Sequence, residues 1–306
     1  MTYNHEDECW QDIQKSAFVW WNRLAKFYPT AFLVVFVSGL LAPFGGLRDR
    51  LTLENAVANI FLLQAWNMNW NFSEIVWFLS VLVFCYACFP VLNGWMERHG
   101  NTLPILISVF LWGASVAIVH QRSSLASLVK AFPPLRVYEF VLGMVVCKAL
   151  FRGRRLRRNA HRLIRGYVFS LIGLLYVCVV LLIQSRIGFS KGGAYTAWTP
   201  GSLALLAGFS ILPFRLESST VGRLFKFFVS ISFSFFMFHL IVLRCFHLFL
   251  RLSGHEADLL FDIVFFGVAL VCTTGLAWMW TRYVLPSLTK GLRNRNPFRA
   301  GTVVSG

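Results

Sequence analysis

The sequence has few charged residues and very few acidic ones. Charged side chains make up 14% of its 306 residues, with 13 Asp and Glu against 29 Lys and Arg, whereas 57% of the residues are hydrophobic. A soluble domain of this length does not need so much apolar surface to form its core. The scarcity of charge therefore excludes an ordinary soluble globular protein and indicates an integral membrane protein.

The sequence contains several long apolar runs. A helix needs about 20 apolar residues to cross a hydrocarbon layer of roughly 30 Å, because its backbone hydrogen bonds must be made internally. The segment Asn55–Trp66 is shorter and is followed by asparagines, which favours a re-entrant or interfacial helix. We therefore expect an all-α, polytopic helical bundle with eight spans, near residues 28–46, 74–95, 103–120, 134–151, 164–184, 201–215, 226–249 and 259–284.

The basic residues are distributed unevenly between the two sides of these spans. Twenty of the 29 fall on the side that holds both termini and the loop Lys148–Arg165. Lys and Arg accumulate on the cytoplasmic side, so we expect a multi-pass protein with both termini in the cytoplasm. Loops beside membrane spans explain the net charge of +16, so membrane lipids rather than nucleic acid are the expected partners. A contact between the run Arg152–Arg165 and an anionic cytoplasmic cofactor is the alternative.

The sequence also lacks a cleavable signal peptide, an internal repeat and a linker between domains. Residues 1–17 and 294–306 are polar, so we expect one transmembrane domain over residues 18–293 between two polar tails. Cys85 and Cys88 form a CxxC inside an expected span, with no second pair of Cys or His at a suitable spacing. Buried thiols of this kind usually behave as small apolar groups, so we expect no metal site.

A few ionisable residues stand inside or beside the spans. Such groups cost roughly several kcal/mol in lipid unless they face a partner or water, which makes them candidates for function. Glu139 follows Arg136 by three residues, so the two can pair on one helix face, either as a structural ion pair or in catalysis. His239 lies in mid-span, and an imidazole can accept and return a proton near neutral pH. Glu74 and Asp262 stand at span ends, where water is available.

Four segments follow one another in a pattern that is known from membrane enzymes. They are FVWWNRLAKFYP (Phe18–Pro29), NIFLLQAWNMNWNFSEIVWFLSVLVFCYACFP (Asn59–Pro90), LRVYEFVLGM (Leu135–Met144) and SISFSFFMFH (Ser230–His239). In order and in residues they resemble the acyltransferase-3 family, polytopic enzymes that acylate sugars and other hydroxyl-bearing acceptors. The span of that family that opens with Trp-Ser-Leu-Ser is matched by Trp77, Leu79, Ser80, Tyr86, Phe89 and Pro90.

The sequence departs from the family at acidic and N-terminal positions. Members usually begin with two further spans, the first of which carries an arginine and a histidine central to acyl transfer, so we expect this chain to be a version shortened at its N-terminus. Leu82 stands where the family continues to Glu, and the last span ends in RYVLP (Arg282–Pro286) where the family tends to have Glu before Pro.

The resemblance implies an acyl-CoA donor that is met from the cytoplasmic side and a hydroxyl acceptor of carbohydrate or lipid type. It implies His239 as the base that activates the acceptor, with Glu139 as its orienter or partner. Arg23 and Lys26, at the entry to the first span, suit the phosphates of the donor or serve as cytoplasmic anchors. The other expected substrate contacts are Trp77, Ser80, Tyr86 and Arg136.

Three interpretations stay open at this point. The first is an acyltransferase, transferring groups other than amino-acyl groups. The second is an inactive or truncated relative that needs a partner to supply the missing histidine. The third is a transporter in which His239 and Glu139 line a path for a substrate or a proton. For Ser80, packing within or between helices is the alternative to a chemical role.

Overall fold

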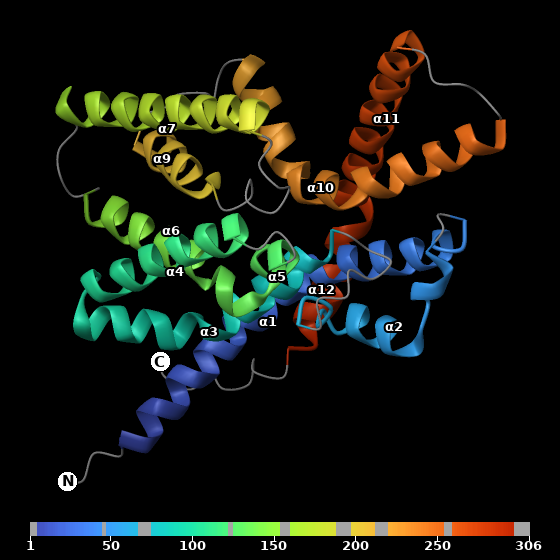
Figure 1. The fold of residues 1–306 in the computed structure, drawn as a ribbon. Helices are drawn as coiled ribbons and strands as arrows, with labels where there is room; N and C mark the ends of the chain where they lie inside the picture. The colour runs from blue at the N-terminus through green and yellow to red at the C-terminus, as the bar shows by residue number, and fades with distance from the viewer. Residues whose placement is uncertain are drawn as a thin grey trace. The chain divides into compact units, whose positions relative to one another are not determined.

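The regular structure of this protein is helical throughout the part of the chain that is described. The computed structural model describes residues 5–44, 47–66, 75–121, 125–153, 160–187, 197–211, 220–253 and 259–296 (Figure 1). Within these ranges, six helices are long and apolar enough to cross a membrane. The expectation of an all-α, multi-pass membrane protein is confirmed.

The six candidate spans agree with six of the eight that the sequence predicts. They are Ala17–Leu41, Trp77–His99, Thr102–Val119, Ile164–Gln184, Gly222–Ser253 and Ile263–Asn294. The expected fourth span forms α6 (Pro133–Gly153), which is 21 residues long but less apolar because it contains Arg136, Glu139 and Lys148. The expected sixth span forms α9 (Thr199–Ile211), which at 13 residues is shorter than a crossing needs.

Helix α1 is longer than the sequence predicts. It runs over His5–Leu41, so that most of the expected N-terminal tail continues the helix of the first span. Pro29 lies inside it without ending it. The sequence predicts a span that begins near residue 28, after the basic residues Arg23 and Lys26, but a helix need not stop where lipid stops.

The chain forms two compact units, which we describe one at a time. Unit 1 comprises Met1–Pro90 and Leu216–Gly306, and unit 2 comprises Val91–Arg215. Unit 1 contains α1, η1 (Arg48–Arg50), α2 (Leu53–Ile60), the first part of α3 (Trp77–His99), α10 (Thr220–Ser253), α11 (Leu259–Met279), η3 (Trp280–Val284) and α12 (Leu285–Asn294).

One hydrophobic cluster holds the helices of unit 1 together. Its most buried members include Val34 of α1, Leu79 of α3 and Phe238 of α10. Leu62, in the turn after α2, joins the cluster with a φ of 58°, in the left-handed region. That conformation costs a leucine about 1–2 kcal/mol, and burying its side chain returns a similar amount. The expected re-entrant segment Asn55–Trp66 is thus a short helix followed by a turn that is anchored in the core.

A wide helical turn connects α11 to α12 and fastens both to the rest of unit 1. Residues Trp280–Val284 form a π-helix, a rare element that often occurs at functional sites. The indole Nε1 of Trp280 donates to Thr30 Oγ1 of α1 at 2.8 Å, and the hydroxyls of Thr281 and Ser234 of α10 are 2.8 Å apart. Through Thr281, the last candidate span therefore contacts the helix that carries His239.

Unit 2 is built around a close pair of helices. It contains the end of α3, α4 (Thr102–Gln121), α5 (Ala126–Ala131) and α6, and Figure 1 shows α7 (Ala160–Ile187) and α9 side by side. Three glycines permit the close approach. A Cβ on Gly173 would lie 2.8 Å from the Leu205 nitrogen, one on Gly201 2.9 Å from the Tyr176 ring, and one on Gly208 2.6 Å from the Ser170 nitrogen. Small residues serve membrane helices in this way, because backbones can then pack against each other.

Candidate active site

His239 is the candidate base, and a hydrogen bond within α10 fixes which nitrogen of its neutral imidazole carries the hydrogen. Its Nδ1 lies 2.6 Å from the carbonyl oxygen of Phe236, one turn earlier on the same helix. A carbonyl oxygen can only accept, so Nδ1 carries a hydrogen, and in the neutral ring the lone pair is therefore on Nε2. The ring is half-buried and packs against the Phe236 ring, with centroids 5.7 Å apart. In the described part of the chain Nε2 has no hydrogen-bond partner, so this nitrogen is available as a base.

Ser80 is one of three residues whose buried hydroxyl oxygen has no hydrogen bond among the described residues, the others being Ser170 and Thr289. Ser80 itself is 1% exposed. The hydroxyls of Ser115 and Thr273 are also buried, but each donates to the carbonyl four residues earlier on its helix, at 2.7 Å. Buried polar atoms without partners are rare in folded proteins, and each one requires an explanation. One such explanation is that the hydroxyl of Ser80 forms its hydrogen bond only with a bound substrate.

Two amides of the segment Asn59–Pro90 share this property with Ser80. Gln64, 3% exposed, has no partner for its side-chain nitrogen or oxygen within the described ranges. Asn59 is fully buried and donates to the carbonyl of Asn55 at 2.8 Å, but its Oδ1 is unpartnered. Both belong to the segment Asn59–Pro90 that contains Ser80. The neighbours Leu62 and Leu79 lie in the same hydrophobic cluster.

Two further predicted residues, Trp77 and Tyr86, lie on α3 together with Ser80. Trp77 is half-buried and meets the Phe78 ring edge to face at a centroid distance of 6.4 Å. Tyr86 is also half-buried, and its ring stacks on Phe27 of α1 at 6.4 Å. Leu82 packs against the hydrophobic cluster of unit 1, so the position at which the family has Glu is apolar in its contacts as well as in its identity.

Arg23 and Lys26 lie near the beginning of the first candidate span. Both side chains are exposed, on the same helix whose other face carries the buried Ala25 and Phe27. An exposed pair of cations at the end of a span can bind phosphate groups and can equally anchor the helix at the membrane surface. Their predicted contact with the donor stays a prediction.

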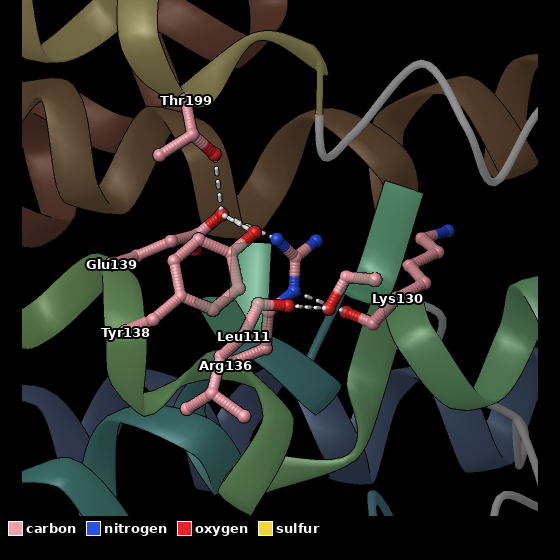
Figure 2. Close-up of polar contacts among 7 residues, drawn as sticks. Leu111, Lys130, Arg136, Tyr138, Glu139 and Thr199 are labelled. Carbon is pink, nitrogen blue, oxygen red and sulfur yellow. Dashed lines mark hydrogen bonds and ion pairs between the residues drawn. The ribbon is translucent and has the colours of Figure 1, made fainter. Parts of the chain in front are cut away.

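Glu139 accepts three hydrogen bonds in unit 2, all on one carboxylate oxygen (Figure 2). The donors to Oε1 are the guanidinium of Arg136, the hydroxyl of Thr199 at 2.9 Å and the hydroxyl of Tyr138 at 3.3 Å. The side chain of Glu139 is 37% exposed, whereas that of Arg136 is 5% exposed. The expected pairing of Arg136 with Glu139 is therefore present, and α9 contributes to it through Thr199.

Arg136 is bound on two sides by the protein itself. In addition to the ion pair, its Nε donates to the carbonyl of Lys130 at 2.9 Å, and Figure 2 shows the guanidinium between this carbonyl and the carboxylate of Glu139. A buried arginine whose hydrogen bonds go to protein groups neutralises its carboxylate partner and fixes the start of α6. Its predicted contact with substrate stays a prediction.

The structure assigns the predicted residues to different units. His239, Ser80, Tyr86, Trp77, Arg23 and Lys26 belong to unit 1, whereas Glu139 and Arg136 belong to unit 2. Glu74 and the side chain of Asp262 lie outside the described residues, as does most of the basic run Arg152–Arg165. In the ranges that the structure describes, no three metal-binding side chains form a group, and the expectation that no metal takes part stays a prediction.

Some residues of the site were missed by reasoning from sequence. Thr199 follows Glu139 by 60 residues, and nothing in its local sequence marks it as the third donor. Trp280 and Thr281 were read as part of an ordinary span. Asn59 and Gln64, in contrast, lie inside the segment already singled out, and two amides in an apolar run could have indicated buried polar groups.

Comparison with known proteins gives one match. A family model described as an acyltransferase domain matches residues 19–282, which is most of the chain. No curated protein and no solved structure matches the sequence. Apart from Phe18, the match contains the four segments on which the resemblance depends, and it ends at residue 282, inside the last candidate span.

Proposed function

Because the chain belongs to the acyltransferase-3 family and is a membrane acyltransferase, we propose that it transfers an acyl group from acyl-CoA to a hydroxyl of a carbohydrate or lipid acceptor, with His239 as general base. One observation carries the assignment of the base. The carbonyl of Phe236 holds the hydrogen of His239 on Nδ1, so that Nε2 is a proton acceptor in the middle of an apolar helix.

The reaction requires one proton to move twice. His239 Nε2 takes the proton of the acceptor hydroxyl while the hydroxyl oxygen attacks the thioester carbonyl carbon. The tetrahedral intermediate collapses, the carbon–sulfur bond breaks, and the departing CoA sulfur takes the proton from the imidazolium. The products are an ester and free CoA, and the histidine returns to its starting state.

The developing oxyanion needs a hydrogen-bond donor, and Ser80 can supply one. A donor that is already desolvated and has no other partner stabilises transition-state charge without first breaking a protein hydrogen bond. The unpartnered Oγ of Ser80 meets this requirement in unit 1, the unit that also contains His239. The amide of Gln64 has the same property and is the second candidate donor.

The phosphates of the donor fit the exposed cations of α1. Arg23 can bind a phosphate through two parallel hydrogen bonds, and Lys26 adds a positive charge one helical turn further along. With the first span oriented as the charge distribution predicts, both residues face the cytoplasm, where acyl-CoA is made. The role of Glu139, which belongs to unit 2, as a partner of the reaction stays a prediction, while the carbonyl of Phe236 holds the imidazole of His239.

The proposal is tested with purified protein, acyl-CoA labelled in the acyl group and a carbohydrate acceptor. We expect release of CoA and transfer of label, and we expect His239→Gln to reduce both by at least about a hundredfold, as loss of a general base does. The matched control is His99→Gln, which replaces an exposed histidine at the end of α3. Transfer that survives in His239→Gln would show that another group is the base. Accumulation of a solute in vesicles without any release of CoA would favour the transporter.

A further inference from the structure

A second cationic site lies at the other end of α1, in a pocket of about 430 Å³ that also belongs to unit 1. Its wall is formed by the end of α1, the turn that follows and the last turns of α10. It is lined by Leu41, Phe44, Leu47, Arg244, His247, Leu248 and Arg251. We propose that this pocket binds the phosphate group of an amphiphile, with its hydrocarbon part against the leucines and the phenylalanine.

The basic residues of the pocket share one face of α10. Arg244, His247 and Arg251 follow one another at intervals of three and four residues, the spacing that aligns side chains along a helix. His247 and Arg251 are exposed, and no described carboxylate pairs with either of them. The described lining contains no acidic residue. A pocket with this charge attracts an anion.

The position of the basic residues of the pocket indicates that they do more than set the orientation of the protein in the membrane. Arg23 and Leu41 are separated by 18 residues of α1, which at 1.5 Å per residue is about 27 Å, close to the thickness of a bilayer core. If Arg23 faces the cytoplasm, the pocket opens on the opposite side, where Lys and Arg are normally depleted. Arg48 and Arg50 of η1 are also at this end, although Asp49 between them offsets one of the two positive charges. The positive-inside rule does not explain basic residues on this side of the membrane, whereas an anionic ligand does.

The apolar half of the lining specifies the rest of the ligand. Phe44 is 61% exposed and Leu41 and Leu248 line the same pocket, next to outward-facing residues of α1 and α10 such as Leu40 and Leu252. A small hydrated anion would leave this surface uncovered, whereas an amphiphile buries it. Arginine suits the phosphate because its fork of donors matches two phosphate oxygens.

The experiment measures binding to purified protein in detergent by native mass spectrometry, with dioleoyl phosphatidic acid, dioleoyl phosphatidylcholine and glycerol 3-phosphate as probes. We expect phosphatidic acid to bind at least tenfold more tightly than either of the others. The double variant Arg244→Gln/Arg251→Gln should weaken that binding at least tenfold, and Phe44→Ser should weaken binding of phosphatidic acid without changing that of glycerol 3-phosphate. The single variant Arg251→Gln, at an exposed position, replaces the double variant if the latter does not fold.

Arg223→Gln is the matched control, because Arg223 is an exposed arginine at the other end of α10. An equal loss in Arg223→Gln and Arg251→Gln would mean general electrostatic attraction and would overturn the proposal. Equal affinities for glycerol 3-phosphate and phosphatidic acid would overturn the proposal that the ligand is an amphiphile and would indicate a site for soluble phosphate esters. None of these outcomes depends on acyl transfer, so the pocket and the proposed function stand or fall separately.

Discussion

At the scale of single residues, removal of the unpartnered hydroxyl of Ser80 should lower activity without lowering stability. Ser80→Ala removes a buried polar atom that has no hydrogen bond, so we expect the free energy of unfolding to stay the same or to rise by about 1 kcal/mol. Ser115→Ala, the control, loses a real hydrogen bond and should cost about 1 kcal/mol. If Ser80 contacts the oxyanion, release of CoA should fall at least about tenfold in Ser80→Ala alone. Thermal unfolding and CoA release measured on both variants decide the matter, and full activity of Ser80→Ala would contradict the role.

The ion pair of Arg136 and Glu139 gives a second prediction. Arg136→Leu leaves a half-buried carboxylate without its cation and also breaks the bond to the Lys130 carbonyl, so we expect a loss of about 3 kcal/mol in the free energy of unfolding. The control is Lys148→Leu, whose contact with Glu97 is 4.0 Å long and exposed on the glutamate side. An exposed pair is worth less than about 1 kcal/mol, so this variant should unfold almost like the unsubstituted protein.

Glu139→Gln distinguishes a structural ion pair from a chemical role. The amide keeps the size of the side chain and an oxygen that can accept from Thr199, while it loses the charge and the basicity of the carboxylate. If Glu139 takes part in the reaction, CoA release should fall at least about tenfold, with a loss of stability smaller than that of Arg136→Leu. Unchanged release with reduced stability would assign Glu139 to the fold of unit 2.

The residues of the site were predictable to different degrees. The pair of Arg136 and Glu139 followed from a spacing of three on one helix, because local geometry fixes it. The bond from His239 to Phe236 is equally local, yet sequence alone could not choose it over a bond to another helix. Thr199 could not be predicted, since its contact with Glu139 depends on the packing of α9.

At the scale of helices, the pair α7 and α9 gives a prediction with an internal control. Gly208→Ala would place a methyl group 2.6 Å from the backbone nitrogen of Ser170 and 2.9 Å from the carbonyl oxygen of Gly166, which cannot move without the helix. We expect a loss of about 1–3 kcal/mol in the free energy of unfolding. Gly113→Ala on α4 meets no atom within 4 Å, so it should be neutral or should gain about 0.5–1 kcal/mol from helix propensity. Thermal unfolding in one detergent compares the two.

Helix existence was predictable and helix length was not. Apolar runs predicted the location of each membrane helix, because burial of the backbone in lipid requires this pattern. The start of α1 at His5 and the length of α9, 13 residues, do not follow from hydropathy. The π-helix at Trp280–Val284 is decided by contacts with Thr30 and Ser234, which lie far away in the sequence.

At the scale of the whole molecule, the charge asymmetry predicts how the protein is inserted. We expect a green fluorescent protein fused after residue 306 to fluoresce when the protein is expressed in a bacterial inner membrane, because the C-terminus should face the cytoplasm. An alkaline phosphatase inserted within residues 188–196 should be active, since the prediction of eight spans, with α6 and α9 both crossing, places these residues on the other side. Inactive phosphatase together with a dark C-terminal fusion would reverse the orientation and place Arg23 and Lys26 away from the cytoplasmic acyl-CoA.

The bond between His239 and its own helix has a consequence for kinetics. In hydrolase triads a carboxylate occupies Nδ1 of the histidine, whereas here an uncharged peptide oxygen of Phe236 does so. The oxygen of a peptide group carries no full negative charge, so the Phe236 carbonyl holds the Nδ1 hydrogen of His239 but stabilises the imidazolium less than a carboxylate does, and only Nε2 gains and loses a proton. The acceptor hydroxyl and the CoA sulfur must then both reach Nε2 of His239, one after the other. Because one proton moves in each step, reaction rates measured in mixtures of light and heavy water should vary linearly with the deuterium fraction.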